Sequence, residues 1–572
     1  LEVIRSALQS LADEATATLI RTGYSTNIKD RRDCTCAVYT PQGEVVAMTE
    51  LGTPHHLGTM HAVVKRVLEE VPLDRYEPGD AVMMNTPYPY GPGHLNDIAL
   101  VTPIFHQGEI VAVMANQAHH VDVGGYAPGS MPFGVSEVFQ EGLQIPPVKI
   151  LKRGVLDEEL MAFFSANVRT RFESRGDTLA QIAANNVGDI RFTELMKRYG
   201  PEALSRYLRA ILDYSERRMR SGISAIRPGE YRGEDFIEGD GITKELVGLR
   251  ASVEVKDGDI YVDFGCTDPQ VQGPINCRWP SVYASVYFAM KAIIDPDLPL
   301  NAGAYRPIHI HIPEGCLLQA IFPAALCNAN IITNQRLVDV ILRALVQAIP
   351  EKVVAGCSGT INLLNLGGID PATGDYYNYI ETYGGGQGAK HNQDGADGQH
   401  NHMANTWNAP VEAIEVTYPL RVEAYGLVPN SEGPGKFRGG MGIQRKLRVL
   451  SGRVMLTVSS DRNRLGPWGA FGGKDGRVAV CTAEGPDGIL RDLGSKVTVN
   501  LDKGDLLTTA TPGGGGWGCP LERDMAKVHW DVIEGLISPE RAKSEYGVVV
   551  EPGNLHLDVE GTEHLRRTMM HS

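Results

Sequence analysis

The sequence predicts a multidomain α+β protein that is rich in β-structure, with a helical segment in the N-terminal half and a glycine-rich β region in the C-terminal part. A chain of 572 residues is too long for one hydrophobic core. Helical periodicity dominates residues 155–225, and 64 glycines and 34 prolines indicate many tight turns. The pattern changes near residues 228 and 355. We therefore expect an α+β domain with the helical segment at 1–228, a mixed α/β domain at 229–355, and a glycine-rich β domain with a helical tail at 356–572.

Helical and extended patterns alternate along the first domain. Apolar residues at helical spacing, such as Leu8, Leu11 and Leu19, predict a helix over residues 1–24. Short apolar runs bounded by turn residues predict strands at 36–39, 45–48, 81–84, 98–102 and 109–115, with a helix at 61–68. Further helices are expected at 157–164, 171–186 and 194–219.

The remaining two domains show weaker but readable patterns. Strands at 253–255 and 260–264 flank the turn sequence Asp257-Gly258, and helices are expected at 279–294 and 334–349. Short strands separated by glycine continue from 356 to 518, followed by a helical tail over 525–546. No period of 20–50 residues repeats, so a solenoid is not expected.

Composition narrows the class of protein. With 42% hydrophobic and 22% charged residues, the chain is typical of a folded globular protein. A net charge of −15 disfavours nucleic acid and anionic membranes as partners, and no apolar run approaches the length of a membrane span. Nine scattered cysteines without framework spacing favour the reducing cytoplasm. The N-terminus carries no export signal, and the missing initiator Met indicates that the numbering starts inside the natural chain.

Two loops supply imidazoles and carboxylates in a pattern that suits a metal ion. His94 and Asp97 lie three residues apart in a loop that begins with Gly91-Pro92-Gly93, and His119-His120 follows an apolar strand. Imidazole nitrogen together with carboxylate oxygen favours Zn²⁺, Mn²⁺ or Fe²⁺ over Ca²⁺ or Mg²⁺. We therefore place the metal site in the first domain.

The contributions of three other positions stay open at this point. Strand alternation sends His119 and His120 to opposite faces, so one can bind the ion while the other contacts substrate or a neighbouring group; we favour His119 as the ligand. His55 and His56 suit proton transfer near neutral pH but also fit a capping turn. Asp33 follows three basic residues, and on its own it is best explained as a surface ion-pair carboxylate.

The glycine-rich runs at 384–388 and 513–518 could cradle anions. Neither continues into the Gly-Lys-Ser/Thr of a phosphate-binding loop, so close backbone packing is the better explanation for both. The pair His400 and His402 departs from known metal-loop spacing. An ATP site within this chain is therefore not indicated.

The order of motifs resembles one family, the hydantoinase B/oxoprolinase proteins. This family includes B-type subunits of ATP-dependent N-methylhydantoinases, lactamases and 5-oxoprolinases, and is related to a large subunit of acetone and acetophenone carboxylases. The matching segments extend along the whole chain and include residues 27–37, 93–97, 118–125, 273–276, 301–303, 381–386, 438–442 and 511–516.

This resemblance implies one divalent metal held by Asp33, His94, Asp97 and His119, which raises Asp33 to a candidate ligand. It also implies a hetero-oligomer in which a separate A-type subunit, with an actin-like ATPase fold, binds ATP and phosphorylates a small cyclic amide. The metal-containing subunit then opens the hydantoin, oxoproline or lactam ring. His56 or His120 would serve as the general base.

Two alternatives share the same ligands. The chain could be the large subunit of an ATP-dependent ketone carboxylase of the acetone or acetophenone type, although the resemblance suggests longer subunits for that group. It could also be a non-catalytic scaffold subunit with a structural metal.

Overall fold

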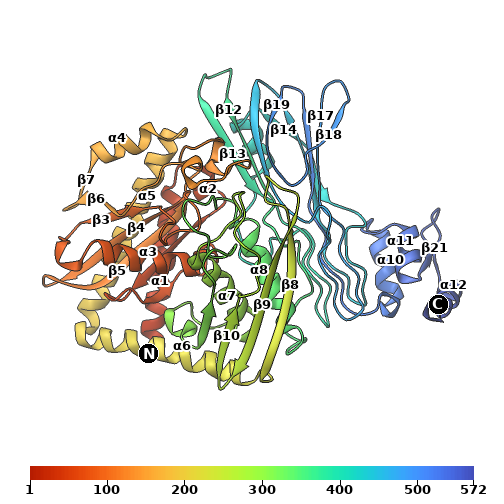
Figure 1. Cartoon of the computed structure of the whole chain (residues 1–572), viewed down its shortest axis with the longest axis horizontal. Coiled ribbons are helices and arrows are strands. Elements are labelled where there is room, and N and C mark those ends of the chain that lie inside the picture. Colours follow the sequence, from red (N-terminus) through yellow and green to blue (C-terminus); the bar gives the residue numbers. More distant parts are fainter. Residues whose placement is uncertain (572) are drawn as a thin grey trace.

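The computed structural model describes residues 1–571, and its N-terminal part is built around one antiparallel sheet of seven strands, in the order β2-β1-β5-β4-β3-β6-β7 (Figure 1). The bounds of these strands are β1 Cys34–Tyr39, β2 Val45–Met48, β3 Ala81–Met84, β4 Asp97–His106, β5 Glu109–His119, β6 Val148–Lys152 and β7 Val155–Leu156. The central strands β1, β5, β4 and β3 are almost wholly buried because helices cover both faces.

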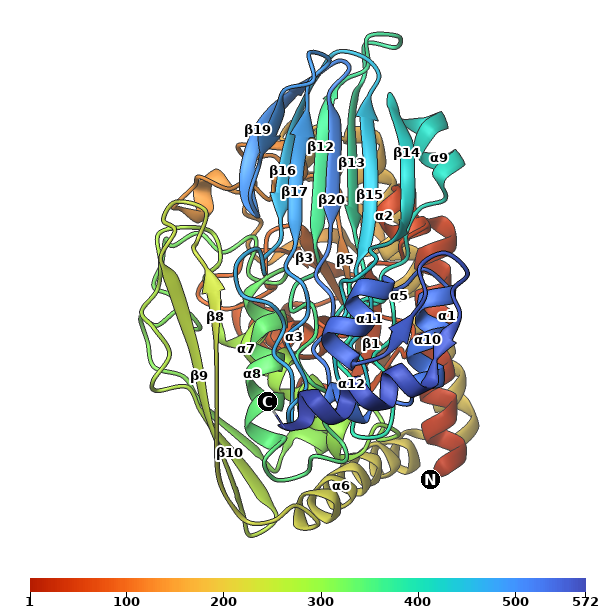
Figure 2. The same ribbon diagram turned by 90° about the vertical axis from the view of Figure 1, so that its right-hand side faces the viewer.

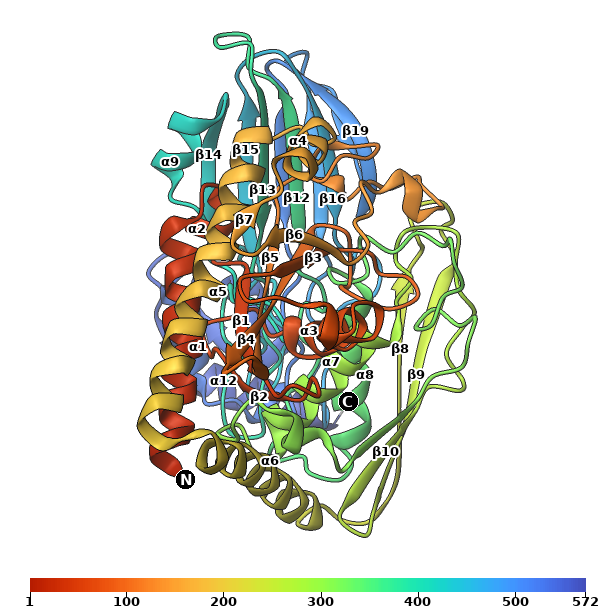
Figure 3. The same cartoon turned by 90° about the vertical axis from the view of Figure 1, so that its left-hand side faces the viewer.

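Two helices, α1 (Glu2–Thr22) and α5 (Arg171–Tyr199), run side by side against one face of this sheet (Figure 3). The apolar side of α1, including Leu8, Leu11 and Leu19, is buried there, as its periodicity predicts. The opposite face is covered by α3 (His56–Glu70). Short helices α2 (Thr26–Lys29) and α4 (Glu158–Ala166) complete this part.

The helical segment differs from the prediction in where it breaks. The expected interruption between residues 186 and 194 is absent, since α5 is continuous to Tyr199 within the described chain. Asn185 and Gly188 are poor helix formers, but Asn185 bonds the strand residues Asn116 and Thr102, and Gly188 lies against Met114. Tertiary packing therefore overrides propensity. The break comes at Gly200, whose φ is 79°, before Pro201 starts α6 (Pro201–Ser224).

The middle segment forms a four-stranded sheet in the order β11-β10-β9-β8, packed on helices α7 and α8. The bounds are β8 Gly229–Glu238, β9 Leu246–Lys256, β10 Asp259–Asp263, α7 Trp279–Ile294, β11 Ile308–His311 and α8 Thr333–Leu345. Its hydrophobic core also includes Val121 and Phe133 from the first predicted domain and Leu363 and Met403 from the third. The boundaries near 228 and 355 stay a prediction.

Two facing sheets form the glycine-rich part, in the orders β13-β12-β16-β19 and β14-β15-β20-β17-β18 (Figure 2). Apolar residues of both sheets, such as Leu366 and Leu456 on one and Leu447 and Leu507 on the other, share one core. The bounds are β12 Leu363–Ile369, β13 Tyr376–Thr382, α9 Val411–Thr417, β14 Leu420–Leu427, β15 Ile443–Val449, β16 Arg453–Ser459, β17 Val480–Glu484, β18 Leu490–Asp492, β19 Lys496–Asp502 and β20 Leu506–Ala510.

A small helical unit follows at the C-terminus and lies beyond the ends of these sheets (Figure 1). It contains α10 Met525–Ile533, α11 Pro539–Tyr546, β21 Val549–Val550, β22 Leu557–Asp558 and α12 Val559–His571. The predicted tail corresponds to α10 and α11, and α12 extends it. The mixture of helices and several sheets confirms the predicted fold class. Within residues 1–571 no helix has both the length and the apolar character needed to cross a membrane.

The glycine-rich runs are tightly packed, as predicted. A Cβ at Gly514 would lie 2.0 Å from the Gln387 carbonyl oxygen, whereas a Cβ at Gly426 would meet nothing within 4 Å. We expect Gly514→Ala to destabilise the protein by about 3 kcal/mol or more, because backbone must move, and Gly426→Ala to be tolerated. Urea denaturation of both variants measures the difference; equal midpoints would contradict the packing argument.

Candidate metal centre

Three of the four predicted ligands, His94, Asp97 and His119, meet at one end of the seven-stranded sheet because of strand register. Asp97 is the first residue of β4 and His119 the last of β5, and the two are directly paired across the antiparallel ladder. Directly paired residues place their side chains on the same face about 5 Å apart. β1 lies on the other side of β5, and the Asp33 carbonyl that precedes it accepts the His119 backbone N–H at 3.0 Å.

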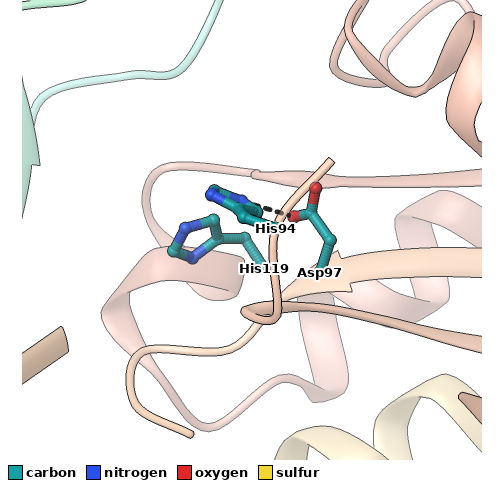
Figure 4. Close-up of side chains that lie close together, drawn as sticks. All are labelled: His94, Asp97 and His119. Atoms are coloured by element: carbon teal, nitrogen blue, oxygen red, sulfur yellow. Dashed lines mark ion pairs between the residues drawn. The ribbon is translucent and has the colours of Figure 1, made fainter. Parts of the chain in front are cut away.

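His94, Asp97 and His119 point toward one another (Figure 4) and each offers a donor atom within 4.8 Å of the other two. His94 Nε2 lies 3.2 Å from Asp97 Oδ1, and the two imidazole rings are 4.9 Å apart. All three side chains are buried. Such a convergence of two imidazoles and a carboxylate is the donor set that binds a divalent transition metal.

The surroundings of these side chains fit a cation. Among the described residues no hydrogen-bond donor reaches the buried atom Asp97 Oδ2, which leaves a carboxylate oxygen free. His94 Nδ1 lies 3.0 Å from the Cys327 carbonyl oxygen, so Nδ1–H can donate there and leave Nε2 as a lone-pair donor. Asn27 Nδ2 contacts both Nδ1 and the carbonyl oxygen of His119, which fixes that ring.

The charges of the cluster are strongly coupled. Burial opposes ionisation of Asp97, but His94 and His56 outweigh it and hold the pKa of Asp97 well below its ordinary value. Burial likewise opposes the charged form of His94, yet Asp97 raises its pKa overall. For His119 burial dominates and lowers the pKa to about 4, so this ring is neutral near pH 7, the form that binds metals.

Asp33 lies in the same pocket but outside the tight group. Its side chain lines the pocket, and its Oδ1 accepts a hydrogen bond from Thr53 Oγ1 at 2.8 Å. Among residues 1–571 the group of donors within 4.8 Å consists of His94, Asp97 and His119. The role of Asp33 as a fourth ligand stays a prediction.

The two candidate bases are placed very differently. His56, the first residue of α3, lines the pocket; its Nε2 is 3.8 Å from Asp97 Oδ1 and its Nδ1 is 2.8 Å from Thr35 Oγ1. His120 lies on the other face of the strand end, as alternation requires, where its Nε2 is 3.0 Å from Gln181 Oε1 of α5. The structure therefore brings His56 to the metal-site pocket and directs His120 into the interface with α5.

The pocket has one polar wall and one apolar wall. The polar wall comes from the first 120 residues, while segments after residue 329 supply most of the opposite side. The apolar residues there are Ile331, Ile361, Leu363, Ile380, Met403 and Ala404. Asn330 and Arg31 also line it. These contributions could not be anticipated, because no local pattern links residues 330–404 to the histidine loops.

His55 is a second pocket histidine that the sequence raised without assigning. It is buried, and burial lowers its pKa to about 3, so the ring is neutral near pH 7. Within the described chain neither ring nitrogen of His55 has a hydrogen-bond partner. A buried imidazole with both nitrogens unpaired in a pocket indicates space for a ligand.

Comparison with known proteins identifies the family of this chain. A model of the hydantoinase B/oxoprolinase family matches residues 1–520. The chain belongs to the hydantoinase B/oxoprolinase family. This confirms the resemblance that the ordered motifs predict.

Members of the family and structures that share the fold are similar over nearly the whole chain. Caprolactamase subunit beta of Pseudomonas jessenii is 30% identical, covering 99% of this chain and 98% of that protein. The crystal structure of the ATP-dependent caprolactamase superposes with a TM-score of 0.92, covering 99% of this chain and 98% of its own. Arabidopsis thaliana 5-oxoprolinase 1 is 32% identical over 91% of this chain but only 41% of its own length. An acetone carboxylase structure (TM-score 0.92, 20% identity, 100% and 82% coverage) shows the same fold.

A second group of residues could in principle bind a metal ion, namely Asp339, Cys357 and His402. His402 Nε2 is 2.9 Å from Asp339 Oδ1; burial acts against protonation, but Cys357 and Asp339 outweigh it and raise the pKa of His402 to about 10. The Arg462 guanidinium lies 3.6 Å from Asp339 Oδ2. A buried guanidinium beside the carboxylate disfavours a second metal cation.

The opposite orientations of His119 and His120 make a direct prediction. His119→Ala should lower the metal content of the purified chain sharply, because it removes a donor. His120→Ala should keep the metal but cost about 1–3 kcal/mol of stability, since Gln181 loses its partner. Elemental analysis with thermal melts measures both. If His120→Ala loses the metal while His119→Ala keeps it, His120 would be the ligand in place of His119.

Proposed function

We propose that this chain is the metal-containing subunit of an ATP-dependent cyclic amidohydrolase, which opens a hydantoin, oxoproline or lactam ring after an A-type ATPase subunit has phosphorylated it. The observation that carries the proposal is the convergence of His94, Asp97 and His119 in a buried pocket with a facing apolar wall. The caprolactamase and 5-oxoprolinase names of its relatives support cyclic amides as the substrate class. The name of the caprolactamase subunit supports a partner subunit.

The chemistry requires activation because an amide carbonyl is a poor electrophile. Transfer of the γ-phosphoryl group of ATP to the amide oxygen gives ADP and an imidate-like phosphate. Water adds to the ring carbon, the C–N bond breaks as nitrogen takes a proton, and a second water releases phosphate. The net reaction consumes the cyclic amide, ATP and two waters, and yields ADP, phosphate and the ring-opened acid, which is an amino acid from a lactam or oxoproline and an N-carbamoyl amino acid from a hydantoin.

The residues of this pocket suit the hydrolytic half. His94, Asp97 and His119, with Asp33 as the proposed fourth ligand, would hold a Zn²⁺, Mn²⁺ or Fe²⁺ ion. Such an ion lowers the pKa of water and stabilises negative charge. We assign His56 as the general base: its Nδ1 is held by Thr35, which leaves Nε2 in the pocket to accept a proton from water. The apolar residues opposite would pack against the methylene groups of the ring.

The test is reconstitution with an A-type ATPase subunit. ATP and a panel of caprolactam, 2-pyrrolidinone, 5-oxoproline and hydantoin are supplied, and ADP and the ring-opened amino acid or N-carbamoyl amino acid are quantified. Ring opening of one member that depends on both subunits and on the metal is the expected result.

A parallel assay separates the alternatives. Radiolabelled bicarbonate and acetone or acetophenone are supplied under the same conditions. Incorporation of label without ring opening would replace the proposal by ketone carboxylation. If the chain keeps its metal but shows neither ring opening nor carboxylation, the result would indicate a scaffold subunit with a structural metal.

A further inference from the structure

Arg31 is an unusual arginine for its place in the chain. It belongs to the basic run Lys29-Asp30-Arg31-Arg32, yet it is only 2% exposed and lines the metal-site pocket. Its Nη1 donates to Asn27 Oδ1 at 2.6 Å and to the Ile380 carbonyl oxygen at 3.1 Å, and its Nη2 donates to Thr382 Oγ1 at 2.9 Å. These bonds tie the guanidinium to both walls of the pocket and hold it in one orientation.

The guanidinium keeps unused donors in spite of this burial. An arginine side chain has five N–H donors, and three are engaged here. Within residues 1–571 the buried Nε finds no hydrogen-bond partner, and Nη2 makes one of its two possible bonds. Nε–H and Nη2–H belong to neighbouring positions of the planar fork that binds carboxylate or phosphate through two parallel bonds. A buried charged donor without a partner is costly, which points to a ligand.

Asn27 connects Arg31 to the metal site. Asn27 accepts from Arg31 through Oδ1 and contacts His119 Nδ1 through Nδ2 at 3.0 Å, so one amide links the guanidinium to a proposed ligand. Asn330 supplies another donor to the pocket, since among the described residues its buried Nδ2 has no partner. The two donors come from segments 300 residues apart in sequence.

Charge complementarity favours an anion at this place. Besides its histidines, the acidic and basic side chains of the pocket wall are Asp33, Asp97 and Arg31. A divalent cation held at the proposed metal site would balance the two carboxylates and would leave the charge of Arg31 uncompensated. An anionic ligand would neutralise it.

We propose that Arg31, through Nε and Nη2, is an oxyanion-binding residue that holds the phosphoryl oxygens of the activated substrate beside the metal site. This rests on the proposed function for the identity of the phosphoryl group, while the anion site itself follows from the unpaired donors. A carboxylate carried by the ring itself offers the same chemistry. The phosphoryl group is preferred because it is the anion that every substrate of the proposed reaction acquires.

Binding of inorganic phosphate to the full chain tests the proposal without any turnover. Titration calorimetry and ³¹P NMR line broadening are recorded for the metal-loaded and the chelated protein. Arg31→Gln should weaken phosphate binding by about tenfold or more, as expected for loss of a charge-assisted hydrogen bond. Arg32→Gln is the matched control: the neighbouring guanidinium stacks on Trp407 at 3.7 Å, and phosphate binding should be unchanged.

A second variant tests the anion site independently if Arg31→Gln fails to fold. Asn330→Asp keeps the shape and the Oδ1 that accepts from Asn334, but it places a carboxylate in the pocket and should also weaken phosphate binding. The proposal would be overturned if the wild type does not bind phosphate, or if both variants bind it as tightly as the wild type.

The source of the anion is decided by competition. Under the proposal, 5-oxoproline and the uncharged 2-pyrrolidinone compete equally weakly with phosphate. Strong, Arg31-dependent competition by 5-oxoproline alone would assign Arg31 to a ring carboxylate and overturn the phosphoryl assignment. Failure of ring opening with Arg31-dependent phosphate binding intact would count against the proposed function and leave the anion site standing.

Discussion

Asp97→Asn is expected to leave the purified chain without its divalent ion and to abolish ring opening. Asp97 lies at the centre of the cluster, with its Oδ1 3.2 Å from His94 Nε2 and 3.8 Å from His56 Nε2. His94 and His56 outweigh the effect of burial and hold the pKa of Asp97 well below its ordinary value, so the carboxylate is ionised near neutral pH. Asparagine keeps the shape but removes the charge, so metal affinity should fall at least about 100-fold and turnover at least about 1000-fold.

Elemental analysis after gel filtration measures metal content, and the reconstituted assay measures turnover. Asp240→Asn is the control, because Asp240 is also buried but accepts bonds from the backbone of Ile242, Thr243 and Gly273, in a turn of the middle segment. That variant should keep one ion per chain even if it melts earlier. Full metal content and turnover in Asp97→Asn would refute the assigned centre.

The second large effect concerns stability rather than chemistry. Arg445 of β15 and Glu381 of β13 form an ion pair with both side chains at most 1% exposed. Glu381 also accepts from the Ala409 backbone and from Tyr379, and the Arg445 guanidinium lies 4.2 Å from the ring centre of Tyr425. Arg445→Met would leave a buried carboxylate without its counter-charge, and we expect a loss of about 3–5 kcal/mol in the free energy of unfolding.

The matched control is Arg453→Met, which breaks an ion pair with Asp502 whose side chains are 67% and 65% exposed. Exposed pairs contribute little, so stability should change by no more than about 0.5 kcal/mol. In the double variant Arg445→Met/Glu381→Gln the loss should be partly recovered, because no unpaired charge remains. Equal denaturation midpoints for Arg445→Met and Arg453→Met would show that this buried pair does not organise the two sheets.

Much of the fold follows from local patterns, and the errors are informative. The apolar stripe of Leu8, Leu11 and Leu19 and the alternating strands near residue 260 were readable because each depends on neighbours within two turns or one hairpin. The predicted helix break after residue 186 was wrong. Asn185 and Gly188 have low helix propensity, but their contacts with the sheet hold the helix together. Such contacts join residues at least 69 positions apart.

The sequence alone identified the residue types of the centre, since His94, Asp97 and His119 stand at loop and strand ends where side chains can converge. Only the tertiary structure decided that β4 and β5 pair Asp97 with His119, that His120 faces α5, and that Arg31 and Asn330 line the same pocket. The physical reason is that the type of side chain and the local helix or strand depend on residues close together in the sequence. Pocket walls and burial arise from strand register and from packing between segments hundreds of residues apart.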